Sequence, residues 1–217
     1  MSRPQQSALW RAQLYGILDL GYVADDKALD IAGKMIAGGV QLLQLRAKSR
    51  KPRGILELAC DLAKLCHERQ VPFILNDRPE LVPECGADGA HVGQDDVGVA
   101  EARKLAGERA IIGKSTHSLT QALAAQKEKP DYIGFGPLFA TPTKPDYTPI
   151  GVDEIQDAQN LVDLPVFCIG GIKRENLPEI IAAGARRVVI VSGILQAQDP
   201  QAYCQECRRI LESVGLV

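Results

Sequence analysis

Eight short apolar runs recur along the chain, and each is followed by a longer segment in which polar and apolar residues are mixed. The runs are apolar throughout rather than alternating, which is typical of parallel strands covered by helices. The segment 28–36 carries apolar residues three and four positions apart, a spacing that predicts an amphipathic helix. The predicted strands are residues 14–18, 40–45, 72–75, 89–92, 110–113, 132–135, 165–169 and 187–191.

Strands that alternate with helices in this way predict an α/β fold, a closed (β/α)8 TIM barrel. Glycines at 38–39, 86 and 184 stand between a helix and the next strand, where a positive φ closes the turn. The alternative, an open doubly wound sheet, usually has fewer strands, and the chain lacks its G-x-G-x-x-G turn. No linker interrupts the pattern, so residues 1–217 are predicted to be one domain.

Two of the predicted strands run directly into carboxylates. Asp77 follows the third strand and Asp96 follows the fourth. Because the carboxyl ends of barrel strands meet on one rim, these two groups should lie close together, where they repel each other unless a cation lies between them. They are therefore the candidate ligands of a divalent metal, with Asp95 as a neighbouring alternative to Asp96.

Cations and an amide follow the second strand. Gln44, Arg46 and Lys48 share one face of an extended chain, because side chains alternate with a period of two. Together with Arg78 on the same rim, they form a patch that suits a polyanion. The alternative is an ordinary solvated exit from a strand.

Other strand ends carry hydroxyls and glycines. The loop after the sixth strand holds Thr141, Thr143 and Lys144, although a loop of this composition is by itself often only a surface connection. Gly-Gly at 170–171 and Ser-Gly at 192–193 follow the seventh and eighth strands, where these barrels commonly bind phosphate. The rim thus predicts a second phosphate site, separate from the carboxylates.

The histidines do not suggest a zinc site, because no pair has the usual ligand spacing. His67 is expected at the surface and His91 in a hydrogen bond inside the barrel. His117 lies on the rim, either near a ligand or at the start of a helix.

Composition narrows the class of protein. A net charge of −2 argues against a nucleic-acid binder, and no apolar run is long enough for a membrane span. Residues 1–10 are polar and lack an apolar h-region, so a signal peptide is not expected there. The six cysteines are expected to be reduced thiols in a cytoplasmic protein, although Cys204 and Cys207 have the C-x-x-C spacing of a metal or redox pair. The sequence leaves the oligomeric state open, homo-oligomers included.

Seven motifs in order resemble the thiamine-phosphate synthase (thiamine-phosphate pyrophosphorylase) family, over nearly the whole chain. They are QLRAK at 44–48, NDR at 76–78, HVGQDD at 91–96, GKSTH at 113–117, GPLFATPTK at 136–144, IGGI at 169–172 and VSGI at 191–194. Lys114 departs from the resemblance, because the family often has a small apolar residue there.

The resemblance implies a (β/α)8 transferase that joins hydroxymethylpyrimidine pyrophosphate to thiazole phosphate and releases pyrophosphate. It implies that Asp77 and Asp96 bind Mg²⁺ and that Gln44 lies by the pyrimidine. The residues that it implies for the pyrophosphate are Arg46, Lys48, Asn76, Ser115 and Lys144, with Arg46, Lys48, Ser115 and Lys144 acting in catalysis. Those that it implies for the thiazole phosphate are Thr141, Thr143, Gly171, Val191 and Ser192.

The chemistry that follows needs no protein nucleophile. Pyrophosphate leaves once cations carry its charge, the aminopyrimidine delocalises the methylene cation, and the thiazole nitrogen adds. Two alternatives remain: a thiazole tautomerase, which needs no pyrophosphate clamp, and a non-catalytic phosphate-binding barrel. In each case the expected partners are small molecules.

Overall fold

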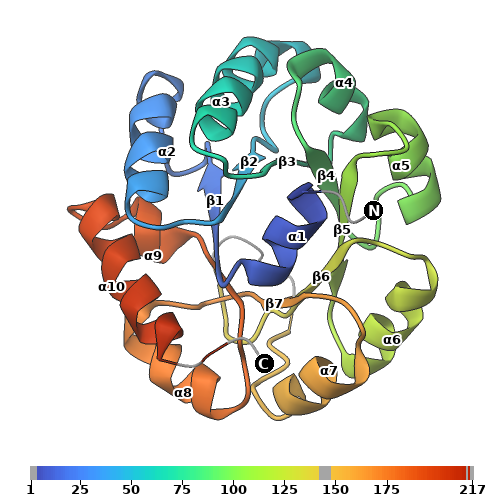
Figure 1. Ribbon diagram of the computed structural model, residues 1–217, viewed down its shortest axis with the longest axis vertical. Helices are drawn as coiled ribbons and strands as arrows, with labels where there is room; N and C mark the ends of the chain where they lie inside the picture. The colour runs from blue at the N-terminus through green and yellow to red at the C-terminus, as the bar shows by residue number, and fades with distance from the viewer. Residues whose placement is uncertain (1–3, 142–147, 214, 216–217) are drawn as a thin grey trace.

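A closed barrel of eight parallel strands forms the centre of the computed structural model, which describes residues 4–141, 148–213 and 215 (Figure 1). Each strand pairs with the next, and β1 pairs with β8. The strands are β1 Leu14–Asp19, β2 Leu42–Arg46, β3 Phe73–Asn76, β4 Gly89–Val92, β5 Ile111–Thr116, β6 Tyr132–Phe135, β7 Val166–Cys168 and β8 Val188–Ile190. The predicted TIM barrel is confirmed.

Helices form a ring around the barrel (Figure 1). They cover the outward side chains of the strands, so both faces of each strand are buried. The helices of the described chain are α1 Pro4–Arg11, α2 Ala28–Ala37, α3 Leu56–Glu68, α4 Val82–Cys85, α5 Val99–Ala106, α6 Leu119–Lys127, α7 Ile155–Leu161, α8 Leu177–Ala182, α9 Ser192–Leu195 and α10 Pro200–Glu212.

Side chains of β1 show how the strands divide between two cores. Leu14 and Leu18 belong to the large cluster between barrel and helices, whereas Tyr15 and Ile17 belong to a smaller cluster inside the barrel. The inner cluster is packed by three aromatic rings, those of Tyr15, Tyr132 and Phe167, whose centroids lie 5.4–5.8 Å apart in edge-to-face contacts. A strand alternates between these two apolar environments, which explains why its sequence shows no polar alternation.

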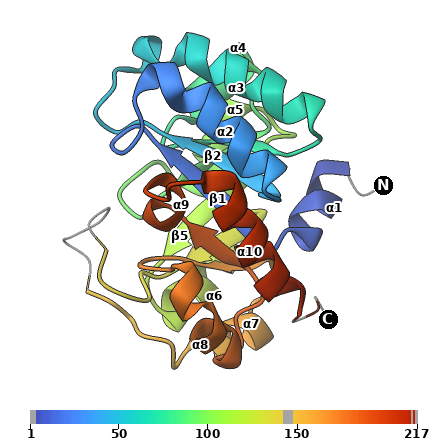
Figure 2. The ribbon, with the colours of Figure 1, turned by 90° about the vertical axis from the view of Figure 1, so that its left-hand side faces the viewer.

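One helix has no counterpart in the sequence prediction. Figure 2 shows α1 at one end of the barrel, and its Leu9 is buried in the inner cluster together with Ala12 just beyond the helix. Arg187 donates a hydrogen bond to the Trp10 carbonyl oxygen over 2.9 Å. A helix of eight residues has too few apolar positions to show a period, so no sequence pattern predicted α1.

The strand ends differ slightly from prediction, and β5 differs most. It was predicted to end at Gly113 but continues to Thr116, whose hydroxyl donates to the Gly134 carbonyl oxygen over 3.0 Å. Polar residues are stable at this strand end because they face either a cavity or the neighbouring strand. Of the predicted turn glycines, Gly39, Gly86 and Gly184 have positive φ, whereas Gly38 keeps a helical φ of −80°.

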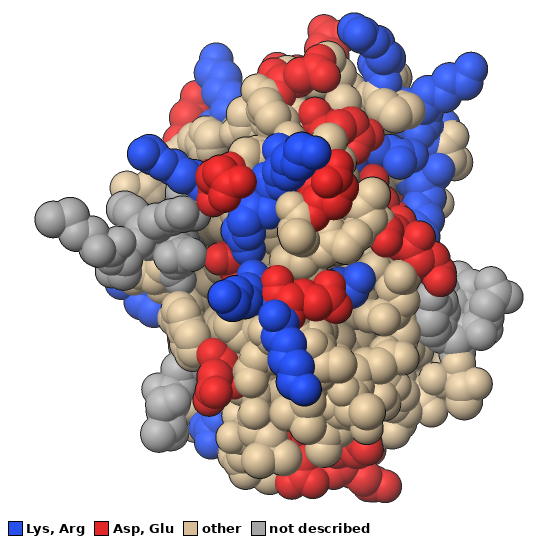
Figure 3. Space-filling view, turned by 90° about the vertical axis from the view of Figure 1, so that its right-hand side faces the viewer, with Lys and Arg blue, Asp and Glu red and all other residues tan. Residues whose placement is uncertain are grey.

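The surface and the cysteines can be compared with what the composition indicated about nucleic-acid binding, membrane spans and a metal or redox cysteine pair. Charges of both signs are interspersed on the face drawn in Figure 3, with no broad basic area there. Within the described ranges no helix is both long and apolar enough to cross a bilayer. Cys204 and Cys207 are free thiols buried on α10, and burial raises the pKa of Cys207 to about 12, as expected for unreactive core thiols.

Candidate active site

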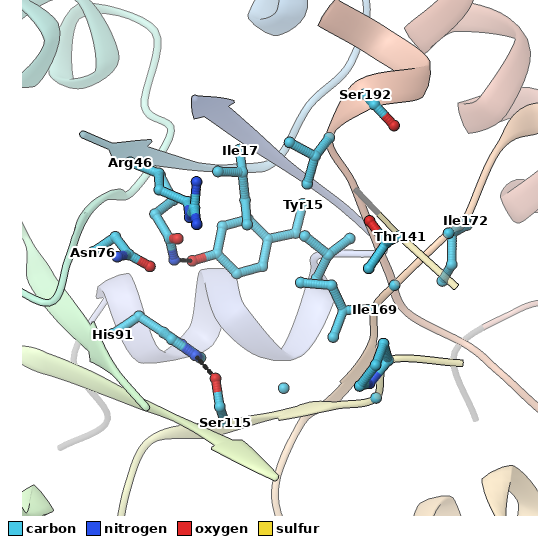
Figure 4. A pocket seen from close by; sticks show the side chains of 18 of the residues that line it. Tyr15, Ile17, Arg46, Asn76, His91, Ser115, Thr141, Ile169, Ile172 and Ser192 are labelled. Carbon is cyan, nitrogen blue, oxygen red and sulfur yellow. Dashed lines mark hydrogen bonds between the residues drawn. The ribbon is translucent and has the colours of Figure 1, made fainter. Parts of the chain in front are cut away.

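A cavity opens at the carboxyl ends of the strands, where the sequence placed its candidate residues (Figure 4). Its apolar walls include Ile17, Ile169 and Ile172, which suit flat organic rings. The predicted site residues that line it are Gln44, Arg46, Asn76, Ser115, Thr141, Gly171, Val191 and Ser192. Thr143 and Lys144 lie outside the described residues.

The two predicted metal ligands lie beside this cavity. The Asp77 carboxyl is within hydrogen-bonding reach of Asp96, and burial together with this like charge raises the pKa of Asp77. Asp96 is held in turn by the Gly93 backbone N–H, which donates to its Oδ2 over 2.7 Å. Asp95 is exposed and has no such contact in the structure as described. The pair meets as predicted, and Asp96 rather than Asp95 completes it.

Two carboxylates this close together are suited to Mg²⁺, which takes one or two carboxylates plus water and phosphate oxygens. Lys48 lies next to the same carboxylates, with its Nζ 3.6 Å from Asp77 Oδ2. The expected shared face of Gln44, Arg46 and Lys48 holds only for the first two, because β2 ends at Arg46 and Lys48 lies in the turn that follows. Among the described residues no group of three or more His, Cys, Asp or Glu could hold a metal, so a transition-metal site gains no support.

The opposite side of the cavity is built from backbone. Gly170 and Gly171 have positive φ, and a Cβ on Gly171 would lie 2.6 Å from the Phe139 Cβ. Only glycine allows the β7 loop to pass this close to the loop after β6. Val191 and Ser192 follow β8 at the same edge of the cavity. This bare backbone suits a phosphate, as the sequence predicted.

The sequence interpretation overlooked Asp19. This residue is 2% exposed, and its Oδ2 accepts a hydrogen bond from Arg46 Nη1 over 2.5 Å. Asp19 and Arg46 are partners in the β1–β2 register, so the ion pair spans adjacent strand ends. The signal was available in the sequence, because the apolar run 14–18 is followed by a carboxylate, as is the run 72–75.

Two tyrosines were also overlooked, because each lies in an apolar strand and was taken as core. The Tyr15 and Tyr132 hydroxyls lie 2.9 Å apart beneath the cavity. Gln44 Nε2 donates to the Tyr15 hydroxyl over 2.5 Å, which places the predicted pyrimidine-side amide at the cavity floor.

The histidines divide as expected. His91 forms hydrogen bonds inside the barrel, to the Tyr132 and Ser115 hydroxyls, and His67 is half-exposed beside Asp88 at the far end. His117 lines the cavity, and its Nδ1 lies 2.5 Å from the Gly136 carbonyl oxygen, which makes it part of the wall.

Comparison with known proteins agrees with this geometry. The family model described as "Thiamine monophosphate synthase" matches residues 14–194. A thiamine-phosphate synthase from Pelotomaculum thermopropionicum is 38% identical over 206 residues, 94% of each chain. One from Gloeobacter violaceus is 42% identical over 172 residues, 79% of this chain and 50% of the relative, so the chain spans about half the length of that relative. A thiamine phosphate pyrophosphorylase structure from Pyrococcus furiosus superposes with a TM-score of 0.87 at 30% identity, covering 95% of this chain and 98% of that one.

Proposed function

The chain belongs to the thiamine monophosphate synthase family, a family of transferases, and from that premise we propose that it joins hydroxymethylpyrimidine pyrophosphate to thiazole phosphate, giving thiamine phosphate and pyrophosphate. The observation that carries the proposal is a cavity with two unlike sides. Carboxylates and cations gather near β2 to β4, while glycine backbone and Ser192 lie near β7 and β8. One side suits a metal-bound pyrophosphate and the other a phosphate monoester.

The reaction in this proposal is a displacement at the pyrimidine methylene carbon. The bond from this carbon to the pyrophosphate oxygen breaks, and pyrophosphate keeps the electron pair. The aminopyrimidine ring delocalises the positive charge until the thiazole nitrogen forms the new carbon–nitrogen bond. The protein's contribution is to align the two rings between apolar walls and to stabilise the leaving charge.

Named residues have distinct parts in this scheme. Arg46, fixed by Asp19, and Lys48 neutralise the pyrophosphate, and Asn76 and Ser115 donate hydrogen bonds to it. Gln44 lies against the pyrimidine, while the phosphate of the thiazole sits on Thr141, Gly171, Val191 and Ser192. Lys144 and Thr143, predicted for these two groups, lie in the segment outside the described residues.

Asp77 and Asp96 would hold Mg²⁺, whose charge, when bound, would further stabilise the departing pyrophosphate. Their fit rests on the two carboxyl groups being within hydrogen-bonding reach, where like charges repel unless a cation lies between them; burial and this contact raise the pKa of Asp77. Metal-bound carboxylates stay ionised, so neither is assigned a proton-transfer step.

The proposal is tested with the two substrates, with Mg²⁺ or with EDTA, and with mass spectrometry as the readout. Thiamine phosphate is expected only when both substrates and Mg²⁺ are present. Isomerisation of the thiazole phosphate without the pyrimidine would instead identify a tautomerase. Binding of thiazole phosphate by calorimetry with no product would identify a non-catalytic barrel.

A further inference from the structure

An unbroken row of hydrogen bonds crosses the floor of the cavity from Gln44 to Ser115. Gln44 Nε2 lies 2.5 Å from the Tyr15 hydroxyl, which lies 2.9 Å from the Tyr132 hydroxyl. Tyr132 lies 3.1 Å from His91 Nδ1, and His91 Nε2 lies 2.8 Å from Ser115 Oγ. Figure 4 shows both ends of the row, the bond at Tyr15 and the bond from His91 to Ser115.

Such a row runs in one of two directions when every hydroxyl donates within it, because a phenol that accepted from both neighbours would leave its own buried proton without an acceptor. Each hydroxyl has one proton to donate, and burial raises the pKa of Tyr15 and of Tyr132 well above the ordinary value, so both remain phenols. A neutral imidazole has one N–H and one bare nitrogen. The donor at one end of the row therefore decides the direction of every bond in it.

The Gln44 amide nitrogen can only donate, and it contacts Tyr15. Tyr15 then donates to Tyr132, because the Gln44 nitrogen cannot accept its buried proton, and Tyr132 donates to His91 Nδ1. His91 carries its proton on Nε2 and donates to Ser115 Oγ, which leaves the Ser115 proton for a ligand in the cavity. In the opposite direction Ser115 would donate its proton to His91 Nε2, and its hydroxyl could then only accept hydrogen bonds from a ligand.

We infer that His91 and Tyr132 are positioning residues that hold the Ser115 hydroxyl as a donor toward the cavity, in a direction set by Gln44. This inference rests on the proposed function, in which Ser115 donates to the departing pyrophosphate. Tyr132 is fully buried and is not among the residues lining the cavity, so it acts on the reaction only through its partners in the row, His91 and Tyr15. The same orientation leaves the Gln44 amide oxygen with no partner among the described residues, available to the amino group of the pyrimidine.

The direction is measured from the ring-nitrogen chemical shifts of the uniformly ¹⁵N-labelled protein without substrates. The chain has three histidines, so His91→Asn assigns its signals. A neutral His91 with its proton on Nε2 is expected. In Gln44→Glu at about pH 8, a carboxylate that only accepts replaces the donor, and the His91 proton is expected to move to Nδ1.

Tyr132→Phe gives the kinetic readout, since it removes one hydroxyl that no substrate touches. We expect kcat to fall between about threefold and tenfold, the range of one hydrogen bond, with both KM values unchanged. Tyr203→Phe is the matched control for the nitrogen shifts, because its hydroxyl accepts from the Arg174 backbone away from the row.

A wild-type His91 with its proton on Nδ1 would overturn the inference, as would an unchanged kcat in Tyr132→Phe. A different result would refute the proposed function. If no thiamine phosphate forms while His91 is protonated on Nε2, the direction of the row stands and the assigned reaction is wrong.

Discussion

The Lys114 ammonium donates a hydrogen bond to the Gly93 carbonyl oxygen over 2.9 Å, although Lys114 is only 5% exposed. Gly93 in turn donates its N–H to the Asp96 carboxylate. This lysine on β5 therefore fixes the short turn that presents a proposed metal ligand after β4. Lys114, which departs from the family resemblance, thus has a structural role at the edge of the site.

Lys114→Met should weaken Mg²⁺ use more than it weakens the fold. Methionine keeps the apolar stem packed but leaves the Gly93 carbonyl without its donor, so the Asp96 turn loses one anchor. We expect the Mg²⁺ concentration for half-maximal rate to rise severalfold, with kcat at saturating Mg²⁺ nearly unchanged. The control is Lys104→Met, which removes an exposed lysine that forms an ion pair with Glu101 on α5. Equal Mg²⁺ titrations for the two variants would contradict this role.

Asp77→Asn should abolish the response to Mg²⁺ while leaving the apo protein at least as stable. Burial and the nearby Asp96 charge raise the pKa of Asp77, so the wild-type pair is repulsive without metal and asparagine relieves it. We expect turnover to fall at least about a hundredfold, and the rise of Tm on adding Mg²⁺ to disappear. Differential scanning calorimetry with and without Mg²⁺ measures the second effect.

Asp95→Asn is the matched control for that experiment, since Asp95 is an exposed neighbour of Asp96. It should keep both the turnover and the Mg²⁺-dependent rise in Tm. Loss of either one would move the ligand assignment from Asp96 toward Asp95.

Asp19→Asn should act through Arg46. The two side chains are only 3% and 14% exposed, so the variant removes the Asp19 charge from beside a shielded guanidinium. We expect KM for the pyrimidine pyrophosphate to rise about tenfold and unfolding to become easier by about 2 kcal/mol, while KM for the thiazole phosphate stays constant. Asp25→Asn, which removes the exposed pair with Arg50, should change neither quantity. Equal changes in both KM values would indicate a general loss of structure.

The order of the strands and the rim position of Asp77 and Asp96 could be predicted because apolar runs and their polar ends are local patterns. The pairing of Asp19 with Arg46 could not, since it depends on the register between β1 and β2. Tyr15 and Tyr132 were interpreted as core residues for a related reason. Inward-facing strand positions are apolar near the barrel centre and polar at the rim, and the sequence does not show how deep in the barrel a position lies. Helix α1 was missed because an eight-residue helix has too few apolar positions to show a period.

Gly171→Ala should separate the two sides of the cavity. The φ of Gly171 is +66°, and its new Cβ would lie 2.6 Å from Phe139 Cβ and 3.0 Å from the Ala140 carbonyl oxygen. The β7 loop must shift to relieve these contacts, which should cost about 1–3 kcal/mol of stability and displace the proposed phosphate cradle. We expect KM for the thiazole phosphate to rise at least about tenfold. In the same assay, KM for the pyrimidine pyrophosphate should change by less than about twofold.

Gly33→Ala is the matched glycine control. Gly33 lies within α2, and nothing lies within 4 Å of the Cβ it would gain. This change should stabilise the protein by about 0.5–1 kcal/mol because alanine favours the helix, and it should leave both KM values unchanged. If Gly171→Ala instead raised KM for the pyrimidine pyrophosphate alone, the cradle after β7 would belong to the pyrophosphate. The two sides of the cavity would then have to be exchanged, with the thiazole phosphate placed against Arg46 and Lys48.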